Sequence, residues 1–440
     1  MRKATLTIAL LAASLGLQAV EIPYRQLTPE KALETYCDWI VSQLPRFNEP
    51  PFEWYFLFYP MRTLLMGANL LNRPDYAEAV WPYMDRYVDE QLPNGALSSN
   101  CRGQPGATMS QQDIEEILSK GKLNLADNGS NVHGLLLGAV TATDPKRRAR
   151  YIAAAKKWLD CWVPIWRLPT GAYGNGIWVG HKLNAPYTMA MNVCSAMAAF
   201  TLITGDEHYI HNAEKFAMFQ CDNWHKTGVP IRFNVYPKPG ADRFCDDFAR
   251  VYYLFEALTW THYVSRDPQV RARIAQRLKE WIDADLIRRW PENRDWFDMN
   301  KCRCQVADEE IFKAYEGVRF YWQACKAAGM TGLLSYYVNN IEDRADLRSR
   351  VERGGRYLCN PLKARMLAVM ADDVEPTFCM QATGFGGLGV AEALRPCSTF
   401  DVYKSCVNRQ GQGLARPRPA SADSRDANPN GGTRHGTRGN

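Results

Sequence analysis

The sequence feature that most constrains the fold is a helical unit that recurs three times along the chain. Three tyrosines each follow a polar or Pro/Asp-containing turn and begin a segment with the apolar spacing of an amphipathic helix. A glycine follows each tyrosine after 19, 20 and 19 residues: the pairs are Tyr76 and Gly95, Tyr151 and Gly171, and Tyr209 and Gly228. This length fits a full helix that stops at a C-terminal glycine. Three matches of nearly constant length indicate an internal repeat.

A second type of helix is predicted between these amphipathic ones. Its segments carry few charges and are rich in Ala, Gly, Ser, Leu and Met. They span 61–71, 132–142, 188–204 and 248–263, and less regularly 309–329 and 384–394. A helix that is apolar nearly all round is buried. Further outer helices are expected at 28–44, from Asp267-Pro268 through Trp281, and at 343–359. Outer and inner helices therefore alternate in about six pairs.

The spacing of these pairs favours a closed ring over an open superhelix. Successive tyrosines of the repeat lie 75 and 58 residues apart, whereas open helical repeats are roughly 34 to 47 residues long. No alternating strand pattern of useful length occurs, which argues against an α/β fold. We predict an all-α protein, an (α/α)6 toroid of alternating inner and outer helices that forms one catalytic domain over residues 20–407.

Both ends of the chain differ from this body. Residues 1–19 have a positive start, an uncharged apolar stretch and a small residue, Ala19, at a cleavage point, which predicts a signal peptide and a secreted or periplasmic protein. The stretch is too short to span a bilayer comfortably, and no later window reaches the roughly 18 apolar residues of a membrane span. No stable membrane insertion is therefore expected. Residues 408–440 are rich in Arg, Gly, Pro, Ser and Asn and are predicted to be a disordered basic tail.

The charge of the chain excludes one class of partner. Arg2 and Lys3 contribute two positive charges and the tail four, so that 6 − 2 − 4 leaves the body at zero. A neutral body argues against nucleic-acid binding, which depends on clustered Lys and Arg. The 13 cysteines form no metal-ligand pattern beyond a lone Cys302-x-Cys304, and no metal site is predicted.

A glycine-rich stretch at 384–389 follows no clear strand. Its glycines suit close packing at the start of a buried helix better than a phosphate cradle. No cofactor is predicted.

The segments that lead into the inner helices carry the candidate chemistry. They are rich in Trp, Tyr, Asn, Asp and Arg, and in a ring they would line one shared bowl. Such a bowl suits an oligosaccharide or polysaccharide, because aromatic faces stack on sugars while polar side chains hold hydroxyls and carboxylates. Glycoside hydrolysis needs carboxyl groups to donate a proton and to activate water. The predicted catalytic residues are Asp127 and Asp247. The predicted substrate-binding residues are Asn131, His133, Trp178, His181, Tyr187, Asp246 and Arg250.

Several of these residues also have a purely structural interpretation. Asp127 precedes Asn-Gly-Ser and is as well placed to cap a helix as to catalyse. Asp246 is likewise a candidate cap, which makes Asp247 the better catalytic candidate of the two. His133 is more typical of a hydrogen-bonded core histidine than of a catalytic base.

The alternating hairpins and the Asp127 and Asp247 positions at inner-helix starts resemble the six-hairpin (α/α)6-barrel glycosidase superfamily, most closely the unsaturated glucuronyl and rhamnogalacturonyl hydrolases. The resemblance covers about residues 28–400 and implies a fold, an activity and a substrate class. By this likeness an aspartate would protonate the enol ether of an unsaturated uronic sugar and direct water onto it. The sugar and its linkage are not indicated.

Two alternatives of different kinds stay open. Polysaccharide lyases share the same ring and need a neutraliser for the uronate carboxylate together with a base for the C5 proton. The candidates for those roles are Asn131, His133, Tyr187, Arg243 and Arg250. The other alternative is a non-catalytic exported protein that binds glycans. Substitution of Asp127 and Asp247 would then leave its glycan affinity, and any turnover measured, unchanged.

Overall fold

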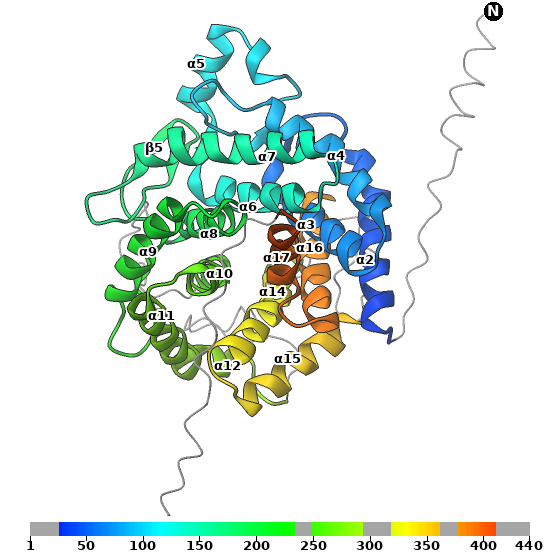
Figure 1. Ribbon diagram of the computed structural model, residues 1–440, viewed down its shortest axis with the longest axis vertical. Helices are drawn as coiled ribbons and strands as arrows, with labels where there is room; N and C mark the ends of the chain where they lie inside the picture. Colours follow the sequence, from blue (N-terminus) through cyan, green and yellow to red (C-terminus); the bar gives the residue numbers. More distant parts are fainter. Residues whose placement is uncertain (1–25, 234–247, 294–317, 361–375, 411–440) are drawn as a thin grey trace, which may run out of the picture.

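The computed structural model describes residues 26–233, 248–293, 318–360 and 376–410. Within these ranges six helices form a closed inner ring, in which each helix packs against the next and the last returns to the first (Figure 1). The inner helices are α3 (Trp54–Leu70), α6 (Leu125–Thr141), α8 (Asn192–Thr204), α10 (Phe248–Val264), α14 (Val318–Asn340) and α16 (Pro376–Leu394). The predicted all-α toroid is therefore confirmed.

Six outer helices surround this ring, and each packs against the inner helix that precedes it in the ring, with α2 packing against α16. They are α2 (Pro29–Gln43), α4 (Pro74–Asp89), α7 (Pro145–Lys157), α9 (Glu207–Asp222), α11 (Pro268–Trp281) and α15 (Ala345–Leu358). Thr28, Asp144, Asp206 and Asp267 cap four of these helices, since each side chain accepts a hydrogen bond from a first-turn backbone N–H. The ring closes where Leu27 N donates to Cys359 O at 2.9 Å.

The repeat glycines lie beyond the helices they were predicted to end. Helices α4 and α9 stop at Asp89 and Asp222, several residues before Gly95 and Gly228, so the predicted glycine stop is wrong. Each glycine instead occupies a turn with a φ of 85°, a conformation that favours glycine. The same two backbone hydrogen bonds close all three turns: Gly95 N to Leu92 O and Leu92 N to Ala96 O, with equivalent pairs at 168–172 and 225–229.

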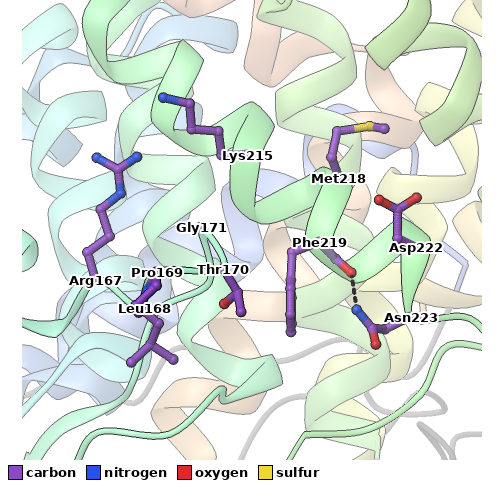
Figure 2. Close-up of a pocket in the computed structure, with 10 residues that line it drawn as sticks. All are labelled: Arg167, Leu168, Pro169, Thr170, Gly171, Lys215, Met218, Phe219, Asp222 and Asn223. Atoms are coloured by element: carbon purple, nitrogen blue, oxygen red, sulfur yellow. Dashed lines mark hydrogen bonds between the residues drawn. The ribbon is translucent and has the colours of Figure 1, made fainter.

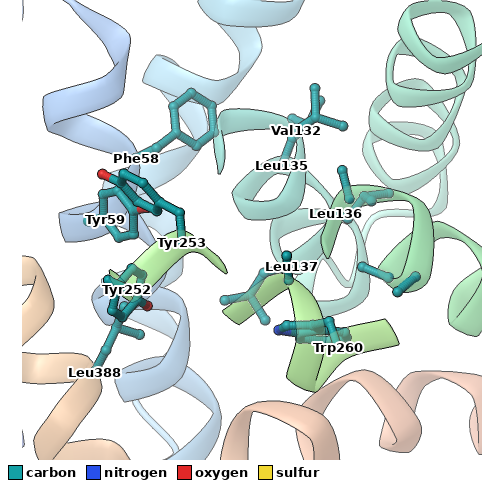
Figure 3. Close-up of a cluster of buried hydrophobic side chains, with 14 of the residues drawn as sticks. Phe58, Tyr59, Val132, Leu135, Leu136, Leu137, Tyr252, Tyr253, Trp260 and Leu388 are labelled. Atoms are coloured by element: carbon teal, nitrogen blue, oxygen red, sulfur yellow. The ribbon is translucent and has the colours of Figure 1, made fainter. Parts of the chain in front are cut away.

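The inner helices pack closely through apolar and small side chains. Aromatic and aliphatic residues from α3, α6, α10 and α16 fill the space between them (Figure 3). A Cβ added to Gly384 of α16 would lie 2.4 Å from Pro60 N, and one added to Gly387 would lie 2.2 Å from Thr63 Cγ2. The prediction that these glycines serve close helix packing is confirmed.

A further helix, α17 (Ser398–Gln410), covers the inside of the ring. The Phe400 ring lies 4.5 Å from that of Trp260 on α10, and Tyr403 donates a hydrogen bond to the backbone oxygen of His133 on α6 at 2.8 Å. These contacts fall in the C-terminal parts of the inner helices or near their midpoints. Helix α17 therefore forms the floor of the ring, opposite the inner-helix starts.

The remaining elements are short. Strand β1 (Phe52–Glu53) pairs with β2 (Asn100–Cys101), and β3 (Lys122–Asn124), β4 (Gly176–Trp178) and β5 (His181–Leu183) form a three-stranded antiparallel sheet. Helix α5 (Gln111–Lys120) projects from the ring. Across the residues described, no helix combines the length and the apolar character that a membrane span requires.

The cysteines whose side chains the structure describes are free thiols, namely Cys37, Cys101, Cys161, Cys194, Cys221, Cys359 and Cys397. Cys194 and Cys221 are buried, and Cys161 is exposed. Residues 1–25 and 411–440 and the Cys302-x-Cys304 pair lie outside the described ranges.

Candidate active site at the ring mouth

The inner helices begin on one face of the ring, which we call the ring mouth. Its described part comprises the starts of α3, α6 and α8 and the β3–β4–β5 sheet. Two predicted site residues, Asp246 and Asp247, lie outside the described residues. Arg250 falls in the first turn of α10, and its side chain is also outside the description.

Asp127 lies in the first turn of α6, in its third position. The helix begins earlier than predicted, at Leu125 rather than near Val132, and Asn124 occupies the N-cap position. Asn175 supplies the capping contacts from the neighbouring strand: its backbone oxygen accepts from Leu125 N at 2.9 Å and its Oδ1 from Ala126 N at 3.1 Å. The interpretation of Asp127 as the helix cap is therefore wrong. Asp127 is 7% exposed.

The residues after Asp127 belong to a polar network rather than to a loop. Tyr87 of α4 donates to Asn128 Oδ1 at 2.8 Å, and Asn131 Nδ2 donates to the same oxygen at 3.4 Å. Burial raises the pKa of Tyr87 well above its usual value; Asn131 opposes this shift and the charge of Asp127 adds to it. Asn131 is thus packed towards the outer helix α4, while Asp127 lies near the same tyrosine.

The β4–β5 hairpin brings two predicted binding residues beside the start of α6. Trp178 is paired with Lys122 of β3 on one side and with His181 on the other. Lys122 Nζ lies 4.9 Å from the centre of the Trp178 ring and donates to Glu53 Oε1 at 2.5 Å. His181 is exposed and Trp178 is partly exposed. The sheet therefore places the Trp178 ring, with Lys122 against it, and the exposed His181 at the rim of the mouth.

Tyr187 stands at the start of α8. It is the N-cap of the short helix η5 (Thr188–Met191), is half-buried, and donates to Met189 Sδ at 3.3 Å. Asn192, the first residue of α8, donates to Ala126 O at 2.7 Å. A Cβ on Gly129 would lie 2.7 Å from the Asn192 backbone, so α6 and α8 meet closely here.

A buried ionic cluster crosses the ring axis about two helical turns below the mouth. Arg62 of α3 donates to Glu256 Oε1 of α10 at 2.8 Å, and these two helices face each other across the ring. Tyr252 also donates to Glu256 Oε1, at 3.3 Å. Burial opposes the charge of Arg62, but Glu256, Tyr252 and Tyr59 together outweigh burial, and the pKa of Arg62 is raised. The cluster holds opposite walls of the ring together.

His133 belongs to this axial cluster and not to the mouth. Its Nδ1 lies 3.8 Å from Glu256 Oε1, and neither ring nitrogen makes a hydrogen bond with a described residue. Burial, followed by the charge of Arg62, lowers the pKa of His133 well below its usual value. The imidazole is therefore neutral near pH 7.

The structure thus gathers Asp127, Trp178, His181 and Tyr187 around the start of α6. Asn131 lies one turn further along α6, whereas His133 belongs to the axial cluster. Sequence reasoning missed Asn175 and Glu256. Glu256 carried a signal, because it is the sole Asp, Glu, Lys or Arg between Val251 and Val264. No group of three metal-binding side chains occurs among the described residues.

No protein-family model matches this sequence, and no curated protein matches it. Solved structures do resemble it. A possible member of glycoside hydrolase family 105 from Salmonella enterica is 11% identical with a TM-score of 0.55, covering 86% of this chain and 97% of that one. The unsaturated glucuronyl hydrolase from Bacillus sp. GL1 is 12% identical with a TM-score of 0.52, covering 83% and 96%. A polysaccharide lyase is 12% identical with a TM-score of 0.51, covering 83% and 98%. These likenesses confirm the six-hairpin toroid as the fold.

Proposed function

We propose that this chain is an exported carbohydrate-active enzyme, a glycoside hydrolase that acts on oligosaccharides containing unsaturated uronic acids. The observation that carries the proposal is the position of Asp127, a nearly buried carboxylate in the first turn of an inner helix at the ring mouth. The fold supports the same conclusion by analogy, since the toroids it resembles include glycoside hydrolases.

Asp127 is assigned the proton-transfer role in this proposal. Its carboxyl group would protonate the enol ether of the unsaturated sugar and then direct water onto it. The low exposure of Asp127 restricts the orientation of its carboxyl group, which general acid catalysis requires. Asp247, which directly precedes α10 in the sequence, is proposed as its partner.

The rim residues are assigned to substrate binding. The Trp178 ring offers a face for a sugar, and Lys122 and His181 beside it favour a carboxylate-bearing one. Tyr187 would contribute a hydroxyl from the α8 side. A buried neutral His133 is assigned no contact with the sugar.

The test is turnover of uronate oligosaccharides by Asp127→Asn. Removal of the acid is expected to lower kcat by about 10²- to 10⁴-fold. Asp75→Asn is the matched control, because Asp75 is also a first-turn carboxylate but belongs to the outer helix α4. Unchanged turnover by a folded Asp127→Asn protein would remove the proposal.

The ultraviolet absorbance of conjugated uronates separates hydrolase from lyase. A hydrolase consumes the unsaturated end group, so absorbance falls on lyase-digested oligosaccharides. A lyase creates that group, so absorbance rises on intact uronate polymers. The lyase alternative is supported by one toroid neighbour. It would be adopted if absorbance rose on polymers and did not fall on digested oligosaccharides. No absorbance change in either assay would favour a glycan-binding protein.

A further inference from the structure

The three glycine turns of the outer wall differ in what packs against them. A Cβ on Gly95 would lie 3.0 Å from Cys161 Cβ, and one on Gly228 would lie 3.0 Å from Ala284 Cβ. Cys161 and Ala284 belong to π-helical turns, η3 (Trp158–Trp162) and η6 (Ile282–Leu286), that extend α7 and α11. Helix α9 ends at Asp222 without such an extension. The turn that contains Gly171 faces α9 itself: a Cβ on Gly171 would lie 3.2 Å from Lys215 Cβ, and an open space remains beside this contact.

A cavity of about 690 Å³ occupies this space, between the turn that contains Gly171 and helix α9. Ligand pockets commonly have volumes of about 300 to 1,000 Å³. Figure 2 shows the cationic side chains of Arg167 and Lys215 on one side and Asp222 and Asn223 on the other, with Met218 and Phe219 between them. The cavity therefore has an apolar centre and two polar ends of different chemistry.

The cationic end has uncompensated charge. Arg167 and Lys215 are both exposed, and neither forms an ion pair with a residue that the structure describes. Guanidinium and ammonium groups that converge in this way bind carboxylates.

The opposite end carries hydrogen-bonding groups for hydroxyls. Asp222 Oδ1 lies 3.5 Å from Arg273 Nη2, a loose contact that leaves its second oxygen to accept hydrogen bonds. Asn223 donates through Nδ2 to Phe219 O at 2.8 Å, which fixes the amide and leaves its Oδ1 as an acceptor. Phe219 between the two ends supplies an aromatic face for the C–H surface of a sugar ring.

The position of the cavity connects it with the ring mouth. Outer helices run opposite to inner ones, so that the ends of α7 and α9 lie on the face where the inner helices begin. Arg167 is bridged to Tyr173, and two residues further on Asn175 caps α6 just before Asp127. A chain that leaves the mouth can thus extend over the wall towards the cavity.

We propose that this cavity is a second saccharide-binding site, which holds a uronic acid residue of a longer chain at the outer edge of the mouth face. The identity of the sugar rests on the proposed function. The uronate carboxylate binds Arg167 and Lys215, the ring stacks on Phe219, and hydroxyls donate to Asp222 and Asn223.

The test measures binding without turnover. Affinity electrophoresis of the full chain, carrying Asp127→Asn, is run against polygalacturonate, alginate, hyaluronan and chondroitin, with dextran as the neutral polymer. We expect retardation by at least one acidic polymer but not by dextran, and a loss of affinity of about tenfold in Lys215→Glu and in Phe219→Ala. The matched control is Lys157→Glu: the carbonyl of Lys157 faces Gly95 as that of Lys215 faces Gly171, but beside a filled turn.

Two results would overturn this inference. One is the absence of retardation by every acidic polymer, and the other is equal retardation of the unsubstituted chain and a folded Lys215→Glu protein. Because the assay records binding in a background without the candidate catalytic acid, these results are distinct from failure of the hydrolase proposal, which turnover assays decide.

Discussion

The hydroxyl of Tyr209 on α9 donates a hydrogen bond of 2.7 Å to Asp160 Oδ1, in the π-helical turn that follows α7. The same contact joins Tyr151 to Asp85 at 2.9 Å, and Tyr76 to Asp38 at 2.7 Å. Each tyrosine of the sequence repeat therefore fastens its outer helix to the preceding one. The repeat that predicts the ring also supplies the contacts along its outer wall.

Substitution of one such tyrosine tests this contact. Tyr209→Phe removes the donor but leaves Asp160 paired with Lys156, so we expect the free energy of unfolding to fall by about 1 kcal/mol. Urea denaturation measures the change. A double-mutant cycle with Asp160→Asn supplies the control, because the second substitution should cost less in the Tyr209→Phe background. Full additivity of the two costs would contradict the assignment.

The turn glycines give a second prediction. Gly95 has a φ of 85° and its added Cβ would lie 2.7 Å from Lys157 O, whereas Gly205 has a φ of 78° and nothing within 4 Å. Gly205→Ala should therefore cost the left-handed backbone penalty alone, about 1–2 kcal/mol. Gly95→Ala should cost more, because the clash with backbone adds to it. Denaturation midpoints that rank the two variants in the opposite order would refute this account.

The axial ion pair predicts an asymmetry between single and double substitutions. Glu256→Gln leaves the Arg62 charge buried without its partner and is expected to destabilise the protein by about 3–5 kcal/mol. Replacing both residues with apolar ones, Arg62→Met with Glu256→Leu, removes that uncompensated charge. Calorimetry should find the double variant more stable than the Glu256→Gln protein. A double variant that is the less stable of the two would show that the cluster contributes more than paired charge.

Buried histidines predict a loss of stability in mild acid. Burial, followed by the charge of Arg271, lowers the pKa of His262 to about 4, and burial also lowers the pKa of His133 well below its usual value. Their unfolded pKa is about 6.5. Below pH 6.5 the unfolded chain binds protons that the folded chain does not. The free energy of unfolding is therefore highest above pH 6.5 and falls towards pH 4, by up to about 1.4 kcal/mol per pH unit for each histidine.

Urea midpoints between pH 7 and pH 4.5 measure this slope. His262→Asn should make it shallower, because one of the two titrating groups is gone. His208→Asn is the control, since His208 is exposed. Identical slopes in all three proteins would disprove the linkage.

The ring was predictable because its cause is local and repeated. Each hairpin carries its own amphipathic outer helix and apolar inner helix, so the periodicity of single segments is enough to define the architecture. The starts of the inner helices were not predictable from the sequence. The polar run from Asp127 to Asn131 reads as a loop, yet it is helical because Tyr59, Tyr87 and Ser99 from other hairpins satisfy its side chains.

The candidate site was predictable in part for the same reason. Trp178 and His181 were identified from a glycine-rich segment outside helical periodicity, and that segment forms a hairpin beside α6. The Arg62–Glu256 pair was missed because its two residues are 194 positions apart and no local pattern joins them. Arg62 is nevertheless the sole Asp, Glu, Lys or Arg of α3, and Glu256 is the sole one of α10 after Arg250, which is a signal for a paired buried charge.

The helix that forms the floor, α17, follows every ring helix in the chain. All six inner and six outer helices are therefore synthesised before α17, the helix that contacts Trp260 and His133. A chain that ended before Ser398 would form a ring without its floor helix. The aromatic side chains that α17 covers would then be exposed to solvent, and chaperones bind such exposed apolar surfaces. The insertion of α17 is consequently expected to be the last step in the folding of this ring.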